Sequence, residues 1–95
     1  MLSGCAIPDF VFYKNEDVTG VTISNSVKII GNSAFEYCNS LSRVNLLDSL
    51  TEIGDFAFAF CENLSGTFTI PSDVETIGSH AFRDCRRITE VIIKN

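Results

Sequence analysis

The chain has 95 residues, of which 45% are hydrophobic and 20% charged, and this balance predicts one folded domain rather than a disordered chain. A net charge of −5 argues against a nucleic-acid partner, because phosphate contacts need a basic face. No apolar run in the sequence approaches the about 20 residues of a membrane span.

The first residues contain a short box that looks like the cleavage site of a bacterial lipoprotein. In Leu2-Ser3-Gly4-Cys5, the lipid would be attached to Cys5. Only Met1 and Leu2 stand where a signal peptide has its charged and apolar regions. The sequence therefore shows no complete signal peptide, and we interpret the box as a chance match, with a truncated lipoprotein start as the alternative.

One pattern recurs four times along the chain. Its copies start at Ile7, Ile30, Ile53 and Ile77, which are 23, 23 and 24 residues apart. Three further positions run in register: Phe12, Phe35, Phe58 and Phe82; Asn15, Cys38, Cys61 and Cys85; Val18, Leu41, Leu64 and Ile88. A fixed period of this length is typical of a stacked solenoid. We therefore predict a single solenoid domain over residues 1–95, with repeats at about 7–29, 30–52, 53–76 and 77–95.

Each repeat opens with a segment that predicts a short helical turn. The residues that would start the turn accept hydrogen bonds well from the free N–H groups at a helix start. They are Asp9, Asn32, Asp55 and Ser79. In the second copy, Ala34, Phe35 and Cys38 then follow at offsets that suit one helix face.

A short strand follows the turn in each repeat. In the second copy, Val44 and Leu46 alternate with Arg43 and Asn45, as in a half-buried strand. The equivalent inward residues are Val21 and Ile23, Phe68 and Ile70, and Val91 and Ile93. Pro71 ends the third strand because proline cannot donate to a ladder, and an extra residue near Gly66-Thr67 precedes that strand. Stacking of the repeats predicts a parallel sheet along one face.

These residues carry a family resemblance. The stretch from Ile30 to Leu46 reads Ile-Gly-x-x-Ala-Phe-x-x-Cys-x-x-Leu-x-x-Val-x-Leu and resembles the BspA-like leucine-rich repeat. The motif recurs from Ile53 and Ile77, and the first copy is looser, with Asn15 in place of the cysteine. The resemblance covers about residues 7–95. The chain departs from the common leucine-rich repeat, where Asn or Cys follows the strand, because Ser26, Ser49 and Asp73 hold that place.

The resemblance implies an α/β repeat fold, a right-handed leucine-rich-repeat solenoid with a parallel sheet of short strands and short helical turns on the other side. It also implies a cell-surface or secreted protein of bacterial or protozoan origin, used in adhesion and protein binding. Members of the family usually carry many more repeats, so a structural spacer or a fragment of a longer array is the alternative function.

The sequence suggests no catalytic or metal chemistry. Cys38, Cys61 and Cys85 recur once per repeat and so form a row, whereas zinc needs four tetrahedral ligands. We predict buried free thiols there, with a disulfide or a metal as alternatives. The single histidine, His80, lies outside this row and is interpreted as a surface residue. We expect no cofactor, no metal and no enzymatic activity.

Aromatic and basic residues form two further groups. The phenylalanines at positions 12, 35, 58 and 82 are predicted to form a core spine, and at least one of Phe56 and Phe60 is expected to be partly exposed. Arg83, Arg86 and Arg87 form a basic cluster. We interpret this cluster as a solvated, partly paired face, with an anion or glycan contact as the alternative.

The outward positions of the strands are the predicted binding surface. They are Thr22, Arg43, Asn45, Thr69, Glu90 and Ile92. The expected partner is a protein, with a host or matrix protein as a candidate, and not nucleic acid. The last strand, around Val91 and Ile93, leaves an unpaired edge in this reading. This edge predicts either that the chain is cut from a longer array or that it associates with itself through its C-terminal end.

Overall fold

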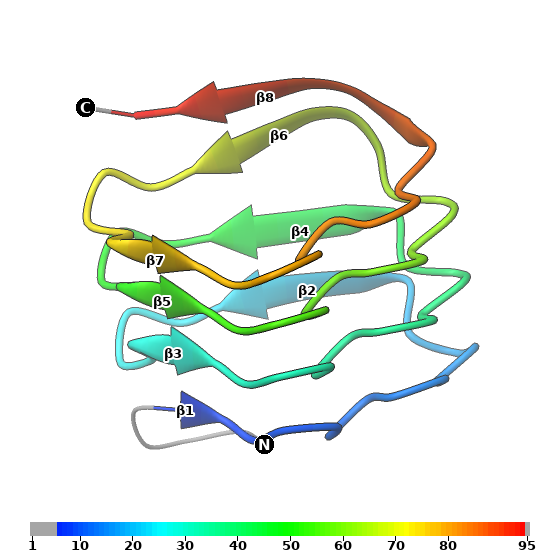
Figure 1. Cartoon of the computed structure of the whole chain (residues 1–95), viewed down its shortest axis with the longest axis horizontal. Helices are drawn as coiled ribbons and strands as arrows, with labels where there is room; N and C mark the ends of the chain where they lie inside the picture. Colours follow the sequence, from blue (N-terminus) through cyan, green and yellow to red (C-terminus); the bar gives the residue numbers. More distant parts are fainter. Residues whose placement is uncertain (1–5, 95) are drawn as a thin grey trace.

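The computed structural model describes residues 6–94, which form a parallel-strand solenoid of about four turns (Figure 1). The strands are β1 (Ala6–Ile7), β2 (Gly20–Ile23), β3 (Ile29–Ile30), β4 (Arg43–Leu46), β5 (Glu52–Ile53), β6 (Ser65–Ile70), β7 (Thr76–Ile77) and β8 (Arg87–Ile93). The lipoprotein-like box at Leu2–Cys5 lies outside the described residues.

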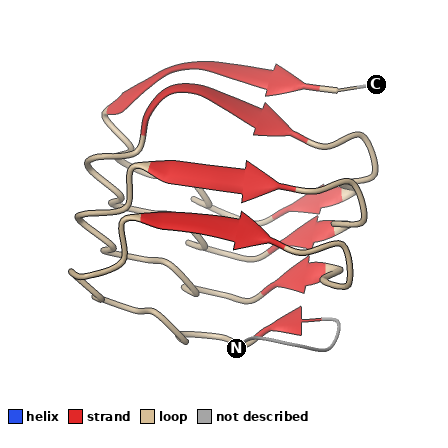
Figure 2. Ribbon diagram, turned by 180° about the vertical axis from the view of Figure 1, so that it is seen from behind, coloured by secondary structure: helices blue, strands red, loops and turns tan. Residues whose placement is uncertain are grey.

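Strands line two opposite faces of the solenoid (Figure 2). On one face the two-residue strands form a four-stranded parallel sheet in the order β1-β3-β5-β7. On the other face the longer strands make two separate parallel pairs, β2 with β4 and β6 with β8. The single sheet expected from the sequence is therefore divided between β4 and β6. Pro71 follows directly after the end of β6, as predicted.

The predicted helical turns are wrong, because residues 6–94 contain no helix. In the second repeat, the N–H of Ala34 donates to the carbonyl of Gly31 at 3.3 Å, which closes a four-residue turn. The N–H of Phe35, in contrast, donates to Ala57 of the next repeat at 2.8 Å. Alternate N–H groups of the segment thus bond within the repeat and between repeats, whereas an α-helix would use all of them internally.

The backbone angles explain why the segment cannot continue as a helix. Ser33 has a φ of 56° and Tyr37 a φ of 62°, each at the third position of a turn, as a type II turn requires. The same two positions have positive φ in every repeat: Phe10 and Lys14, Phe56 and Phe60, and His80 and Asp84. A right-handed helix needs negative φ throughout, so these residues interrupt it every few positions.

The predicted capping residues do accept hydrogen bonds, but from the neighbouring repeat. The carboxylate of Asp9 accepts from the N–H of Asn32, and the amide oxygen of Asn32 accepts from the N–H of Asp55, both at 2.8 Å. The carboxylate of Asp55 accepts from the N–H of Ser79 at the same distance. A Cβ on Gly54 would lie 2.6 Å from the Asn32 oxygen, so glycine permits this close contact.

The predicted phenylalanine spine is confirmed and forms the centre of the core. Phe35 and Phe58 are fully buried, and their rings stack with centroids 5.2 Å apart and planes 1° from parallel. Phe12 stacks on Phe35 at 5.3 Å and Phe82 on Phe58 at 5.6 Å, each half-buried at one end of the row. Stacked aromatic pairs contribute about 0.5–1.5 kcal/mol beyond the burial of their surface.

Candidate binding surface on the strand face

The outward side of β2, β4, β6 and β8, here called the strand face, contains all six residues predicted to bind a partner. Each of the six is exposed: Thr22, Arg43, Asn45, Thr69, Glu90 and Ile92. Side chains alternate along a strand, so their neighbours point inward, and Ile23, Phe68 and Ile70 are buried. This buried layer does not extend to β8, where Val91 and Ile93, which the sequence predicted to face inward, are 50% and 65% exposed.

The strand register brings these residues together in pairs. Thr22 lies beside Asn45 on the β2–β4 pair, and Thr69 lies beside Ile92 on the β6–β8 pair. Arg43 lies beside Gly20, and Glu90 beside Thr67. Because β4 and β6 are not hydrogen-bonded to each other, the six residues form two groups of three rather than one continuous array.

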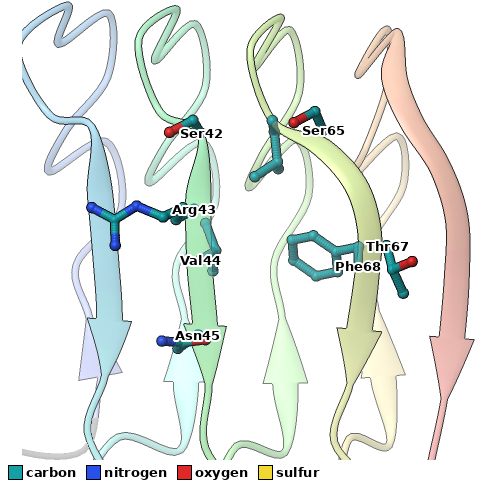
Figure 3. Close-up of a pocket in the computed structure, with 8 residues that line it drawn as sticks. Ser42, Arg43, Val44, Asn45, Ser65, Thr67 and Phe68 are labelled. Atoms are coloured by element: carbon teal, nitrogen blue, oxygen red, sulfur yellow. The ribbon is translucent and has the colours of Figure 1, made fainter.

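An open groove of about 230 Å³ separates the two groups (Figure 3). Its lining is mostly polar and comes from β4, β6 and the residues just before them: Ser42, Arg43, Val44, Asn45, Leu64, Ser65, Thr67 and Phe68. Of these, the sequence prediction named only Arg43 and Asn45. It missed the hydroxyl groups of Ser42, Ser65 and Thr67, and only the extra residue near Gly66 hinted that the third strand differs from the others.

The pairing of β6 with β8 is irregular near that extra residue. Gly66 has a φ of 75°, in the region that favours glycine, and the register of β6 and β8 shifts between Gly66 and Thr67. Gly66 pairs with Ile88 and Thr67 with Glu90, so one residue of β8 is left without a pairing partner. A bulge of this kind bends a strand pair. Both strands arch near their start before they straighten (Figure 1).

Arg43 supplies a positive charge beside the groove, on the side of β4 that faces β2 (Figure 3). Its guanidinium lies over β2, where a Cβ on Gly20 would come within 2.7 Å of Nη2, so glycine makes room for it. The one side-chain ion pair within residues 6–94 joins Arg83 and Asp84 at 3.8 Å. Arg43 therefore has no carboxylate partner in this part of the chain and is available to an acidic group.

The cysteine row lies outside the strands of the strand face, and burial keeps its thiols protonated. Cys38, Cys61 and Cys85 are free thiols, the first two fully buried and the third half-buried. Burial raises the pKa of Cys38 to about 11, and burial also raises the pKa of Cys61 and Cys85. Within residues 6–94, no three His, Cys, Asp or Glu side chains are grouped to hold a metal ion.

His80, Arg83 and Arg86 lie in the turns of the last repeat, and Arg87 is the first residue of β8. His80 is exposed, as predicted, and it stacks on Phe56 at 5.2 Å while its Nδ1 shares a hydrogen bond of 2.7 Å with the Ser79 hydroxyl. The Arg83 guanidinium lies 5.9 Å from the ring centroid of Phe60. Phe56 and Phe60 are both half-buried, which confirms the expected partial exposure.

No helix in the described part of the chain could cross a membrane.

Three solved structures are similar to this chain. A leucine-rich repeat protein from Bacteroides capillosus is 38% identical, with a TM-score of 0.85 over 96% of this chain and 64% of that one. The leucine-rich repeat protein of T. pallidum is 30% identical, with a TM-score of 0.75 over 92% and 51%. A leucine-rich cell surface protein from Faecalibacterium prausnitzii is 29% identical, with a TM-score of 0.60 over 95% and 31%.

The chain therefore spans less than two thirds of each of these structures. None of the proteins with curated functions matches it. A family model, described as the BspA type leucine-rich repeat region (6 copies), matches residues 5–95. That match covers nearly the whole length, and the chain belongs to the BspA-type leucine-rich repeat family.

Proposed function

We propose that this chain is a protein-binding module of a cell-surface or secreted protein, and that the strand face makes the contact. The observation that carries the proposal is the set of exposed, mostly polar residues on β2, β4, β6 and β8, which a polar groove divides into two groups. Side chains on rigid strands lose little freedom when a partner binds, which favours affinity.

The chemistry of the groove suggests what the partner offers. Arg43 supplies a positive charge with no carboxylate partner within residues 6–94, and Asn45 and the Ser65 hydroxyl supply hydrogen-bond donors and acceptors. The Ser42 hydroxyl donates to the carbonyl of Thr19 and so supplies an acceptor. A carboxylate pairs strongly with a guanidinium because both are planar and can form two parallel hydrogen bonds. We therefore infer a protein partner that places an acidic side chain beside Arg43.

The proposed location rests on the family and on one relative. The Faecalibacterium prausnitzii structure is described as a cell surface protein, and its resemblance to this chain supports a surface or secreted location. A structural spacer is the second candidate. It is favoured by the three similar solved structures, of which this chain spans 64%, 51% and 31%.

The test is a binding assay of the purified chain against a panel of host and matrix proteins. For any protein that binds, we expect Arg43→Glu combined with Asn45→Lys to abolish binding. The control variant combines Lys28→Glu with Asn25→Lys, which makes the same change in net charge at exposed residues outside β2, β4, β6 and β8. Equal affinities of the two variants would overturn the assignment of the strand face.

A further inference from the structure

The groove between β4 and β6 lies where a regular stack would have ladder hydrogen bonds. On the β4 side, the N–H of Arg43 donates to the carbonyl of Thr19, just before β2, at 3.3 Å. Backbone groups alternate in direction along a strand that pairs with its neighbours. The N–H and the carbonyl of Val44 therefore point the other way, toward β6.

The β6 side presents the matching groups. The carbonyl of Ile70 accepts from the N–H of Lys94, just after β8, at 3.0 Å. By the same alternation, the N–H and the carbonyl of Thr67 and Thr69 point toward β4. Because β4 and β6 are not hydrogen-bonded to each other, backbone donors and acceptors border the groove from both sides.

The side chains around the groove also combine donors with acceptors. The carboxamide of Asn45 and the hydroxyl of Ser65 each offer both. The Thr67 hydroxyl donates to the Glu90 carboxylate at 3.4 Å and so adds an acceptor. The one charged residue of the lining, Arg43, places its guanidinium over β2. The space between β4 and β6 is thus polar without a dominant charge.

The groove has an apolar floor in a fixed position. Phe68 and Leu64 line it and are only 5% and 2% exposed, and the Phe68 ring extends from β6 toward β4 (Figure 3). Phe68 packs edge-on against Phe58 at 5.7 Å and against Phe82 at 4.8 Å between ring centroids. The core therefore holds this floor in place.

This combination favours a ligand that is rich in hydroxyl groups and uncharged. A hydroxyl both donates and accepts hydrogen bonds, whereas a carboxylate only accepts and an ammonium group only donates. A sugar ring carries several hydroxyls around its edge, and its C–H groups can lie on an apolar floor. The groove holds about 230 Å³, less than the roughly 300–1,000 Å³ of pockets for drug-sized ligands, so it suits a single ring.

We propose that the groove between β4 and β6 binds one neutral sugar unit of a glycan. The hydroxyls of the sugar would bridge the backbone groups of Val44 and Thr67 and the side chains of Asn45 and Ser65, with the ring above Phe68. This site goes beyond the protein contact proposed beside Arg43 and does not rest on it, because the Arg43 guanidinium lies on the other side of β4.

The test is NMR of the ¹⁵N-labelled chain during titration with methyl glycosides of glucose, galactose, mannose and N-acetylglucosamine. We expect at least one glycoside to shift the amide signals of Val44 and Thr67 in a saturable way and to leave Glu52, in the opposite sheet, unchanged. The experiment contains no protein partner, so its outcome is independent of the contact beside Arg43.

Two variants and a control locate the site. Thr67→Val removes one hydroxyl and should weaken binding about two- to tenfold. Ser65→Phe places a ring in the groove and should abolish binding. The control, Thr76→Val, makes the same change as Thr67→Val at an exposed strand residue of the opposite sheet and should bind like the wild type. The NMR spectrum of each variant without glycoside shows whether the fold is retained.

Three results would overturn the proposal: no saturable shift with any of the four glycosides, equal shifts at Val44 and Glu52, or equal affinities of Thr67→Val and Thr76→Val. With the sugar that binds best, a neutral polysaccharide and a glycoprotein that both carry it distinguish the two sources of the unit. Binding of either one through the groove, lost in Ser65→Phe, supports the proposal.

Discussion

The thiol of Cys61 donates a hydrogen bond of 3.1 Å to the backbone carbonyl of Phe35 in the preceding repeat. The same carbonyl accepts the N–H of Cys38 at 3.2 Å, so the thiol occupies its second lone pair. The contact recurs from Cys38 to Phe12 and from Cys85 to Phe58. The cysteine thus fills a small buried volume and also links one repeat to the one before it.

Burial of these thiols predicts how fast they react. Cys38 and Cys61 are fully buried, so they should resist alkylation in the native protein, whereas half-buried Cys85 should react faster. Mass spectrometry after timed alkylation, with and without denaturant, measures the three rates. Native labelling of Cys61 as fast as that of Cys85 would contradict the inward position of the row.

The raised thiol pKa values predict a loss of stability in alkaline solution. The pKa of Cys38 is raised from 9.0 to about 11 because burial disfavours the thiolate. Between those values the unfolded chain has released the thiol proton while the folded chain retains it, so the free energy of unfolding falls as pH rises. Urea midpoints at neutral pH and above pH 9 should show this fall, and Cys38→Ala should reduce it. A pH slope unchanged by that substitution would refute the assignment to Cys38.

The phenylalanine spine predicts a graded response to truncation. Phe58 is fully buried between two rings of the row, so Phe58→Ala should lower the free energy of unfolding by about 3–5 kcal/mol. Phe12 is half-buried and stacks on one ring of the row, so Phe12→Ala should cost less. Denaturant midpoints compare the two variants. A smaller effect at Phe58 than at Phe12 would contradict the stacking order.

The positive backbone angles predict an unusual response to glycine. Lys14 is exposed with a φ of 59°, a conformation that costs an L-residue about 1–2 kcal/mol but costs glycine nothing. Lys14→Gly should therefore leave the melting temperature unchanged or raise it. Glu16, two residues later, is exposed without a positive φ, and Glu16→Gly should lower the melting temperature. A larger loss at Lys14 would show that its backbone is not strained.

Much of the fold could be predicted from the sequence because the repeat fixes which residues face inward. The phenylalanine spine, the end of β6 at Pro71 and the exposure of Arg43 and Asn45 all follow from that spacing. The helical turns were wrongly predicted for a physical reason. The positions that break the helix hold residues such as Phe56 and Tyr37, and nothing in such side chains indicates a positive φ.

The groove is the second feature that could not be predicted from the sequence. One extra residue near Gly66 signals an irregularity, but it does not reveal that β4 and β6 separate or that Ser65 and Thr67 then line an opening. Strand pairing depends on the path of both strands, and a bulge changes that path over several residues. The prediction thus placed the six residues together on the strand face, but it missed the groove that divides them.

The most direct test of the strand face as the binding surface is site-specific photo-cross-linking to a protein that binds the chain. A photoreactive amino acid replaces Asn45 in one variant and Glu52 in another, since both are exposed and β5 lies in the opposite sheet (Figure 2). The account predicts that the bound protein is cross-linked from position 45 and not from position 52. Cross-linking from position 52 alone would contradict it.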